Sequence, residues 1–313
     1  MNIIYQIIRT ARPRQWLKNF SLFAAPLFAG RLFHEEVLFV SIWAFVAFSL
    51  LSSTAYFFND IIDAEKDKLH PIKKNRPIAS GKLPKNLAWV ILGLMLTSAF
   101  YLAITYVGTF FSYAMVFYIF VQLAYSLYLR DVIILDSLVV ASGFVIRVFA
   151  GGLASSTSIS SWLALTTIGV SLLMAFGKRR SEKTIVKNYY NSTEVDTRKT
   201  LRHYPDALLD SMISMAATYT IITYSLFTFQ ISSQTATGKL LTVLPSILKS
   251  PKWMMLTIPF VIYGVARYLY VIYEKHEGES PERVLLSDFP LLLTVVLWSI
   301  SVLLINYLIP LFV

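Results

Sequence analysis

The sequence contains no cysteine and few charged residues. The lack of cysteine excludes disulfides, thiolate metal ligands and cysteine nucleophiles. Charged residues make up 15% of the 313 positions, whereas a soluble domain carries about 25%. Apolar residues account for 56%, and the mean hydropathy is +0.60. This composition argues against a water-exposed globule and predicts a membrane protein.

Apolar runs recur along the whole chain and are long enough to cross a membrane. A helix of about 20 apolar residues spans a hydrocarbon core of about 30 Å. The runs predict an all-α, polytopic membrane protein, a single domain over residues 1–313 with about nine transmembrane helices. Two long hydrophilic loops, residues 59–85 and 178–206, interrupt the spans. The predicted spans are residues 18–33, 37–58, 86–106, 109–129, 131–152, 160–177, 207–230, 252–274 and 287–311.

The basic residues determine the predicted orientation. Most of the 28 Lys and Arg residues lie in the N-terminal segment and the two long loops. We expect the protein in the inner (cytoplasmic) membrane. Because cytoplasmic loops carry the excess of Lys and Arg, we expect the N-terminus and both long loops on the cytoplasmic side and the C-terminus on the outer side. We interpret residues 1–18 as a retained amphipathic segment, since they lack a signal-peptide cleavage site. The net charge of +10 favours anionic lipid or phosphate partners over nucleic acid, because the basic residues flank apolar spans.

An acidic motif ends the second predicted span. Asp60, Asp63 and Asp67 are spaced by three and four residues, which places their carboxylates on one face of a helix. Stacked like charges repel one another, and Mg²⁺ is a hard cation that takes carboxylate and phosphate oxygens. The spacing therefore predicts a Mg²⁺ site at the membrane boundary. The alternative is an acidic helix end that only contacts water.

Basic and polar residues elsewhere predict that phosphate binds beside this motif. Arg76, stiffened by Pro77, can hold a phosphate bidentately. Lys18 precedes the first span, and Tyr125 and Arg130 end the fourth. We expect all of them around a cavity that opens to the cytoplasmic side. Each also has a simpler explanation as a topogenic charge, an interfacial anchor or part of an aromatic belt.

The sixth predicted span ends in a basic segment. Lys178 and Glu182 form an i,i+4 pair on the helical continuation. The segment predicts either a second phosphate-binding loop or a topogenic cluster. Two arginines lie inside spans: we expect Arg147 near the far interface, snorkelling or in an internal pair, and Arg267 as a secondary candidate for the cavity.

Several of these motifs resemble those of a known family. The N-D-x-x-D-x-x-x-D signature of the UbiA superfamily of intramembrane prenyltransferases is similar to Asn59-Asp60-Ile-Ile-Asp63-Ala-Glu-Lys-Asp67. The family's R-P-[IL]-x-x-G segment is similar to residues Arg76 to Gly81, and its Y-[ST]-x-x-x-K element to Tyr125 to Arg130, with Arg in place of Lys. The resemblance covers nearly the whole chain, and it implies nine helices around a membrane-embedded site.

One departure from the family pattern points to a particular branch. Members that prenylate aromatic acceptors carry a second aspartate-rich motif, where this chain has the basic segment from Lys178 to Glu182. That segment, with residues 12–19 and 143–152, resembles the decaprenyl-phosphate phosphoribosyltransferase branch. The resemblance implies an enzyme that transfers 5-phosphoribose from phosphoribosyl pyrophosphate to a polyprenyl phosphate for cell-envelope glycan precursors, releasing pyrophosphate.

The same resemblance implies roles for the site residues. The aspartates would hold Mg²⁺ and neutralise the leaving group, with Asn59 bonding a phosphate or a metal-bound water. The donor's phosphates would be held by Arg76, Lys178 and Arg179. The last two lie in the segment that includes Glu182. The lipid phosphate would be positioned by Lys18, Tyr125 and Arg130.

Two other functions fit parts of the pattern. A prenyltransferase would move a prenyl group from a prenyl diphosphate to an aromatic or glycerol phosphate acceptor. An anion transporter would carry charges near mid-bilayer, whereas most of these charges gather at one face. An oligomer is compatible with the sequence.

Overall fold

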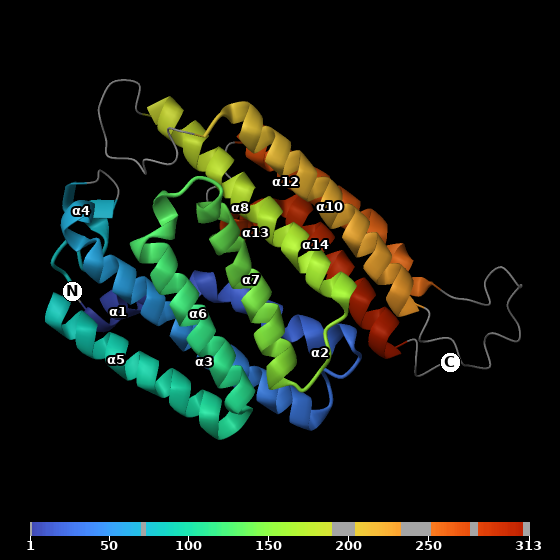
Figure 1. Ribbon diagram of the computed structural model, residues 1–313, viewed down its shortest axis with the longest axis horizontal. Coiled ribbons are helices and arrows are strands. Elements are labelled where there is room, and N and C mark those ends of the chain that lie inside the picture. Colours follow the sequence, from blue (N-terminus) through green and yellow to red (C-terminus); the bar gives the residue numbers. More distant parts are fainter. Residues whose placement is uncertain (1, 70–72, 190–203, 233–251, 276–280, 309–313) are drawn as a thin grey trace, which may run out of the picture.

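The computed structural model describes residues 2–69, 73–189, 204–232, 252–275 and 281–308, and these residues form a bundle of helices without a strand (Figure 1). The long helices are α3 (Glu35–Ile62), α5 (Lys85–Leu102), α6 (Thr109–Leu127), α7 (Leu135–Ala154), α8 (Ser161–Tyr189), α10 (Asp206–Ser232), α12 (Ile258–Tyr270) and α14 (Phe289–Leu303). The shorter helices are α1 (Ile3–Ala11), α2 (Ala24–Phe28), α4 (Ala64–Leu69) and α13 (Pro281–Ser287). The 3₁₀ helices are η1 (Pro13–Phe23), η2 (Lys73–Asn75), η4 (Leu129–Asp131) and η6 (Trp253–Thr257). Three π-helical turns, Ala103–Val107, Val271–Lys275 and Leu304–Leu308, extend α5, α12 and α14.

Eight helices of the described residues are long and apolar enough to cross a membrane. They match the second to the ninth predicted spans, so the all-α polytopic fold is confirmed. The first predicted span, residues 18–33, is not one uninterrupted α-helix but the 3₁₀ helix η1 followed by α2. At 2.0 and 1.5 Å per residue these two helices together are roughly 30 Å long, which is also the thickness of a hydrocarbon core.

Helix α8 is longer than the sixth predicted span. It continues through residues 178–189, where the sequence predicts a loop. Ion pairs to α10 hold this extension: Arg180 lies 2.8 Å from Asp210, and Lys183 lies 2.7 Å from Asp206. The predicted loop residues 190–203 lie outside the described residues.

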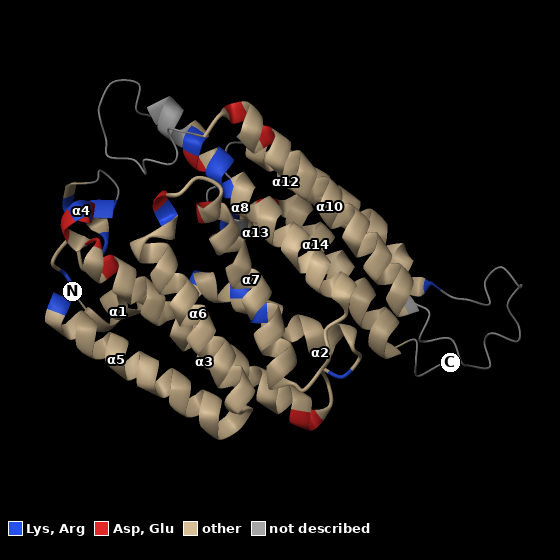
Figure 2. Cartoon of the chain, viewed as in Figure 1, with Lys and Arg blue, Asp and Glu red and all other residues tan. Residues whose placement is uncertain are grey.

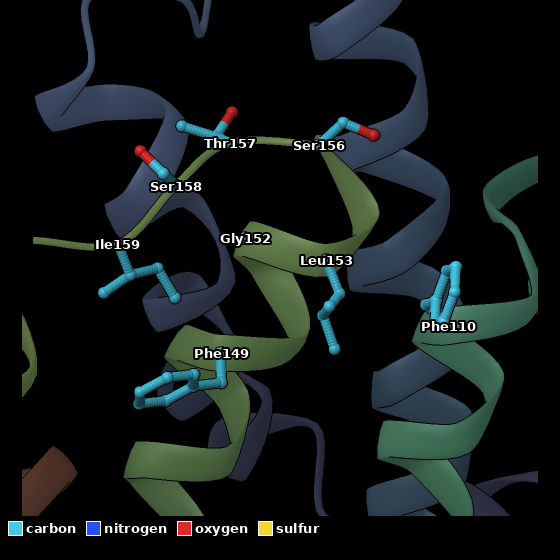
Figure 3. Close-up of a pocket in the computed structure, with 8 residues that line it drawn as sticks. All are labelled: Phe110, Phe149, Gly152, Leu153, Ser156, Thr157, Ser158 and Ile159. Carbon is cyan, nitrogen blue, oxygen red and sulfur yellow. The ribbon is translucent and has the colours of Figure 1, made fainter.

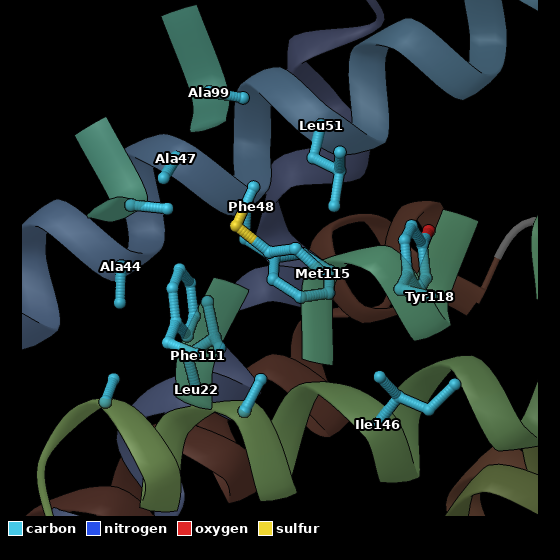
Figure 4. Close-up of a cluster of buried hydrophobic side chains, with 13 residues drawn as sticks. Leu22, Ala44, Ala47, Phe48, Leu51, Ala99, Phe111, Met115, Tyr118 and Ile146 are labelled. Carbon is cyan, nitrogen blue, oxygen red and sulfur yellow. The ribbon is translucent and has the colours of Figure 1, made fainter. Parts of the chain in front are cut away.

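The core of the N-terminal half lies between α3, α5, α6 and α7. Phe48, Leu51, Phe111 and Met115 are buried there, as Figure 4 shows. Backbone contact replaces side-chain packing at one point, since a Cβ added to Gly151 of α7 would lie 1.9 Å from the carbonyl oxygen of Leu22 in η1. Only glycine allows η1 and α7 to approach this closely.

Charged residues gather at one end of the bundle. Figure 2 shows them around α4, the connection between α6 and α7, and the C-terminal part of α8, while the lengths of the helices are mostly uncharged. We call this region the charged end. It brings together the described parts of both hydrophilic segments that the sequence places on one side of the membrane.

Candidate active site

The acidic motif lies where α3 passes into α4. The backbone keeps its helical bonding across this junction, since Asp63 N donates to Asn59 O (2.9 Å) and Asp67 N donates to Asp63 O (2.8 Å). The side chains of Asp60 and Asp67 are 2% and 6% exposed, and that of Asp63 is 22% exposed. Two of the three carboxylates are therefore enclosed by protein, and the third reaches the surface of the site.

Guanidinium groups neutralise all three carboxylates. Arg76 Nη1 donates to Asp60 Oδ1 (3.1 Å) and to Asp67 Oδ2 (2.7 Å). Arg130 of η4 lies 3.2 Å from the nearer oxygen of Asp63. The repulsion that the spacing implies is thus offset by arginines of the chain itself.

Arg12 also belongs to this cluster, although the sequence argument did not select it. Its Nη2 donates to Asp60 Oδ1 at 2.7 Å, and its guanidinium lies 4.9 Å from the ring centre of Tyr56. The backbone of Arg12 is left-handed (φ +53°) where α1 ends and Pro13 begins η1. A non-glycine residue rarely adopts this conformation. An arginine at a helix end directly before proline is the sequence signal that could have indicated it.

The 3₁₀ helix η1 brings Lys18 to the same region. Lys18 Nζ donates to Gln15 Oε1 (2.6 Å), and Gln15 accepts a second bond from the Tyr56 hydroxyl (3.3 Å). Asn19, by contrast, is fully buried and points into the bundle. Lys18 therefore lies on the α3 side of the site and directly precedes the buried Asn19 in the sequence.

The end of α6 connects the acidic motif to α8. Ser126 Oγ donates to Asn59 Oδ1 at 2.7 Å, and the Tyr125 hydroxyl accepts a bond from Arg179 Nη2 at 3.2 Å. Adjacent residues of α6 thus contact α3 and α8. The predicted residues from the three helices are brought together as one cluster.

Arg179 is one of the most enclosed side chains of the protein, at 2% exposure. Its Nε lies 2.6 Å from Asp136 Oδ2, and its Nη1 lies 2.6 Å from Glu182 Oε2. Lys178, which is 32% exposed, lies 3.8 Å from Glu182, so the predicted i,i+4 pair is present. Of the two cations, Lys178 is the one with surface to offer a ligand.

Asp136 is a second residue that the sequence argument missed. It is fully buried in the first turn of α7 and accepts a bond from the Tyr204 hydroxyl (2.6 Å) besides its pair with Arg179. Burial raises the pKa of Tyr204, so this hydroxyl stays protonated and keeps donating. An aspartate inside an otherwise apolar helix start was the available signal, because a carboxylate in a membrane protein needs a partner.

The oxygen donors of the acidic motif fit a hard divalent cation when a ligand supplies further oxygens. Within the described residues, no three acidic or histidine side chains group closely enough to hold a metal ion by themselves. Asp60 and Asp67 do converge on one cationic nitrogen, Nη1 of Arg76. Mg²⁺ is commonly held by one or two carboxylates plus substrate phosphates. The donor set therefore suits a metal–diphosphate complex better than a metal ion alone.

Among the described residues, no hydrogen bond or ion pair joins either arginine within a span to the carboxylates of this cluster. Arg147 is 12 residues into α7, which is roughly 18 Å along the helix and nearer mid-membrane than the far interface. It is 5% exposed and bonded to Asn19, Tyr118 and Gly143, so the predicted snorkelling is not observed. Arg267 makes two bonds to Asp288, of 2.9 and 3.0 Å, at the start of α14.

A shallow apolar groove of about 450 Å³ lies at the other end of α7 (Figure 3). Phe149 and Leu153 of α7 line it, together with Phe110 of α6 and residues 156–159 of the following loop. None of its lining residues is charged, so its chemistry differs from that of the charged end. We do not assign the candidate site to this groove.

Comparison with known proteins gives both a family and a fold. The UbiA prenyltransferase family matches residues 20–291. The chain is 34% identical to decaprenyl-phosphate phosphoribosyltransferase of Mycolicibacterium smegmatis, over 95% of this chain and 91% of that protein. It is 31% identical to the protein of the same name from Corynebacterium glutamicum, over 99% of this chain and 90% of that protein.

Solved structures share the fold at low sequence identity. A UbiA homologue from Archaeoglobus fulgidus, bound to GPP and Mg²⁺, superposes with a TM-score of 0.66 and 16% identity, covering 95% of this chain and 98% of that chain. A digeranylgeranylglyceryl phosphate synthase superposes with a TM-score of 0.62 and 13% identity, covering 97% and 99% of the two chains. The helical arrangement described above is therefore that of these membrane proteins.

Proposed function

Since the chain belongs to the UbiA prenyltransferase family, we propose that it is a Mg²⁺-dependent transferase that moves 5-phosphoribose from phosphoribosyl pyrophosphate to a polyprenyl phosphate. The names of the curated relatives, at 31 to 34% identity over most of the chain, support this substrate pair. The product would serve cell-envelope glycan synthesis. The basic loops support a location in the cytoplasmic membrane with the N-terminus and the charged end facing the cytoplasm.

The observation that carries the proposal is the meeting of three carboxylates with three guanidinium groups at the charged end. Asp60 and Asp67 contact Arg76, Asp60 also contacts Arg12, and Asp63 contacts Arg130. Such a cluster can take a polyanion together with a divalent cation, because the anion then pairs with the arginines and the cation with the aspartates. A phosphorylated sugar diphosphate has this character.

Exposure and position in the site assign each side chain to the phosphoribosyl donor or to the lipid acceptor. Arg76 and Lys178, which are 27% and 32% exposed, would bind the donor's phosphates. Arg12 would join them, because it shares Asp60 with Arg76. Buried Arg179 would act by holding Tyr125 and Glu182 in place rather than by touching the donor.

The lipid phosphate would be bound on the other side of the cluster. Lys18 of η1, Tyr125 at the end of α6 and Arg130 of η4 offer an ammonium, a hydroxyl and a guanidinium to it. Asn59, held by Ser126 at 2.7 Å, lies between the two groups of residues. Its amide is fixed in orientation and can donate to a phosphate oxygen of either substrate.

In the reaction, a phosphate oxygen of the lipid attacks the anomeric carbon, and the bond from that carbon to pyrophosphate breaks. A phosphate monoester is already anionic at neutral pH, so no general base is needed. Bound Mg²⁺, held by Asp60, Asp63 and Asp67, would neutralise charge on the leaving pyrophosphate. The chain's own contribution is to align the two phosphorylated substrates and to exclude alternative orientations.

A labelled-donor assay tests the proposal. The purified protein is incubated with phosphoribosyl pyrophosphate labelled in the ribose, a polyprenyl phosphate and Mg²⁺, and the lipid phase is extracted. We expect label in the lipid phase only when both substrates and Mg²⁺ are present. If label stays in water while a prenyl diphosphate is consumed with an aromatic or glycerol phosphate acceptor, the chain is instead a prenyltransferase.

A further inference from the structure

Arg147 is a buried cation near the middle of the membrane whose hydrogen-bond partners are neutral. Its Nε donates to Asn19 Oδ1 (2.7 Å), its Nη2 to the Tyr118 hydroxyl (2.8 Å) and its Nη1 to Gly143 O (2.8 Å). The ring of Phe48 lies 5.5 Å from the guanidinium. No ion pair involves Arg147 in the described part of the chain. A charge at this depth is costly, so its presence calls for a function.

The contacts of Arg147 indicate what that function is. The guanidinium is closed in by side chains and is 5% exposed. Its Nε bond holds Asn19, a fully buried residue of η1 that also donates to Ser49 Oγ at 3.0 Å. Arg147 therefore connects α7 to η1 through Asn19, which lies 128 positions earlier in the sequence. Four residues further along α7, Gly151 meets the backbone of η1 at Leu22.

Helix η1 needs such support because of its conformation. It is a 3₁₀ helix of 11 residues, whereas such helices rarely exceed about four residues. With three residues per turn, residues at i and i+3 lie in one row. Trp16, Asn19 and Leu22 form the inner row: Trp16 Nε1 donates to Ser53 Oγ of α3 at 3.0 Å, and Leu22 is 1% exposed.

A second row faces the candidate site. Gln15 and Lys18 are again three residues apart and are joined by the bond of 2.6 Å from Lys18 Nζ to Gln15 Oε1. Arg12 lies outside this row, because it precedes η1 and reaches Asp60 from a left-handed backbone (φ +53°). In an α-helix, successive residues at this spacing would be displaced by about 60° around the axis. The 3₁₀ conformation is therefore what aligns the side chains of Gln15 and Lys18.

We propose that Arg147 is a positioning residue: by bonding Asn19 it holds η1 in the 3₁₀ conformation and so aligns Gln15 and Lys18 at the candidate site. Its effect on catalysis rests on the proposed function. Its effect on η1 does not, so the two can be tested separately.

Hydrogen exchange tests the structural half of the proposal. We expect the amides of residues 14–23 to exchange at least about tenfold faster in Arg147→Gln than in the wild type, since a charged hydrogen bond is lost. The matched control is Arg180→Gln, which removes an arginine that pairs α8 with Asp210 of α10 and should leave exchange in η1 unchanged. Unchanged exchange in Arg147→Gln would overturn the proposal whatever reaction the protein catalyses.

A double-mutant cycle tests the catalytic half. If Arg147 acts through the row that contains Lys18, then Arg147→Gln should lower kcat/KM about tenfold or more in the wild type. It should have little further effect in a Lys18→Ala background. Independent, multiplicative losses would refute the positioning role. Absence of phosphoribosyl transfer by the wild type would refute the proposed function only, and hydrogen exchange would still decide the role of Arg147 in η1.

The Asn19 side of the bond provides a second variant should Arg147→Gln fail to fold. Asn19→Ala removes the acceptor and should reproduce both effects, while Asn19→Asp keeps an acceptor oxygen for Arg147 and should restore exchange protection and kcat/KM toward wild type. Equal behaviour of the two Asn19 variants would show that the bond to Arg147 does not hold η1.

Discussion

Replacing Asp63 with Asn should abolish activity while leaving the protein folded. Asp63 is the most exposed of the three aspartates, and its only described ion pair is a contact of 3.2 Å with Arg130. Exposed pairs of this kind contribute about 0–1 kcal/mol to stability. With side chains that are 22% and 27% exposed, we expect Asp63→Asn to cost about 1 kcal/mol, a fall in Tm of a few degrees.

The expected loss of activity is far larger. Loss of a group that stabilises charge on the leaving pyrophosphate should lower kcat by about a hundredfold or more, equivalent to about 2.7 kcal/mol. Asp60→Asn should lose both activity and stability, because buried Asp60 accepts bonds from two arginines. Removing one partner from a buried ion pair costs about 3 kcal/mol or more. The two variants therefore separate catalysis from folding.

The assay is lipid-phase transfer of labelled phosphoribose, run beside thermal unfolding of each variant in detergent. Glu65→Gln is the matched control, since Glu65 lies two residues beyond Asp63 and is 65% exposed. Hydrogen bonds from Lys68 and Lys85 lower the pKa of Glu65 to about 2, so this variant removes an ionised carboxylate that faces water. Near-normal turnover by Asp63→Asn, or an equal loss of turnover in Asp63→Asn and Glu65→Gln, would refute the reasoning.

Four further substitutions, one of them with a matched control, have defined outcomes. Arg76→Lys should raise the donor KM about tenfold or more, because the guanidinium can contact the carboxylates through Nη1 and a phosphate through its other nitrogens, whereas an ammonium has a single nitrogen; an unchanged KM would contradict this. Lys178→Ala should raise the donor KM more than the acceptor KM in steady-state kinetics, and the reverse would interchange the two phosphate sites. Asp136→Asn should lower stability by about 3 kcal/mol, because buried Arg179 loses one of its two carboxylate partners, and an unchanged Tm in thermal unfolding would contradict this. Gly151→Ala should destabilise the protein because its Cβ would lie 1.9 Å from a backbone oxygen, whereas Gly93→Ala, with no atom within 4 Å of its Cβ, should leave the Tm almost unchanged.

Most of the fold could be predicted from the sequence because each span carries its own signal. The length of each apolar run alone identifies eight of the nine predicted spans, since every helix must be long enough to cross the same bilayer. The first span was harder to predict. Its residues are apolar enough for a helix, but the bond that Trp16 donates to Ser53 and the bond that Asn19 accepts from Arg147 favour a 3₁₀ conformation. Bonds to distant residues leave no local pattern in the sequence.

The candidate site was partly predictable for a related reason. Regular spacing revealed the aspartates, and local chemistry revealed Arg76 and Lys178. Arg12 was missed because its role depends on a left-handed backbone that points it toward Asp60, 48 residues away. Asp136 was missed because its partner, Arg179, lies on the next helix.

Binding of phosphoribosyl pyrophosphate to the purified protein without lipid acceptor tests the central claim most directly. The charged end should bind this donor saturably in the presence of Mg²⁺, as measured by calorimetry. Binding should be lost on Mg²⁺ removal and in Asp63→Asn, and retained in Glu65→Gln. Donor binding that is indifferent to Mg²⁺ and to Asp63 would contradict the assignment of this cluster as the site of the metal–diphosphate complex.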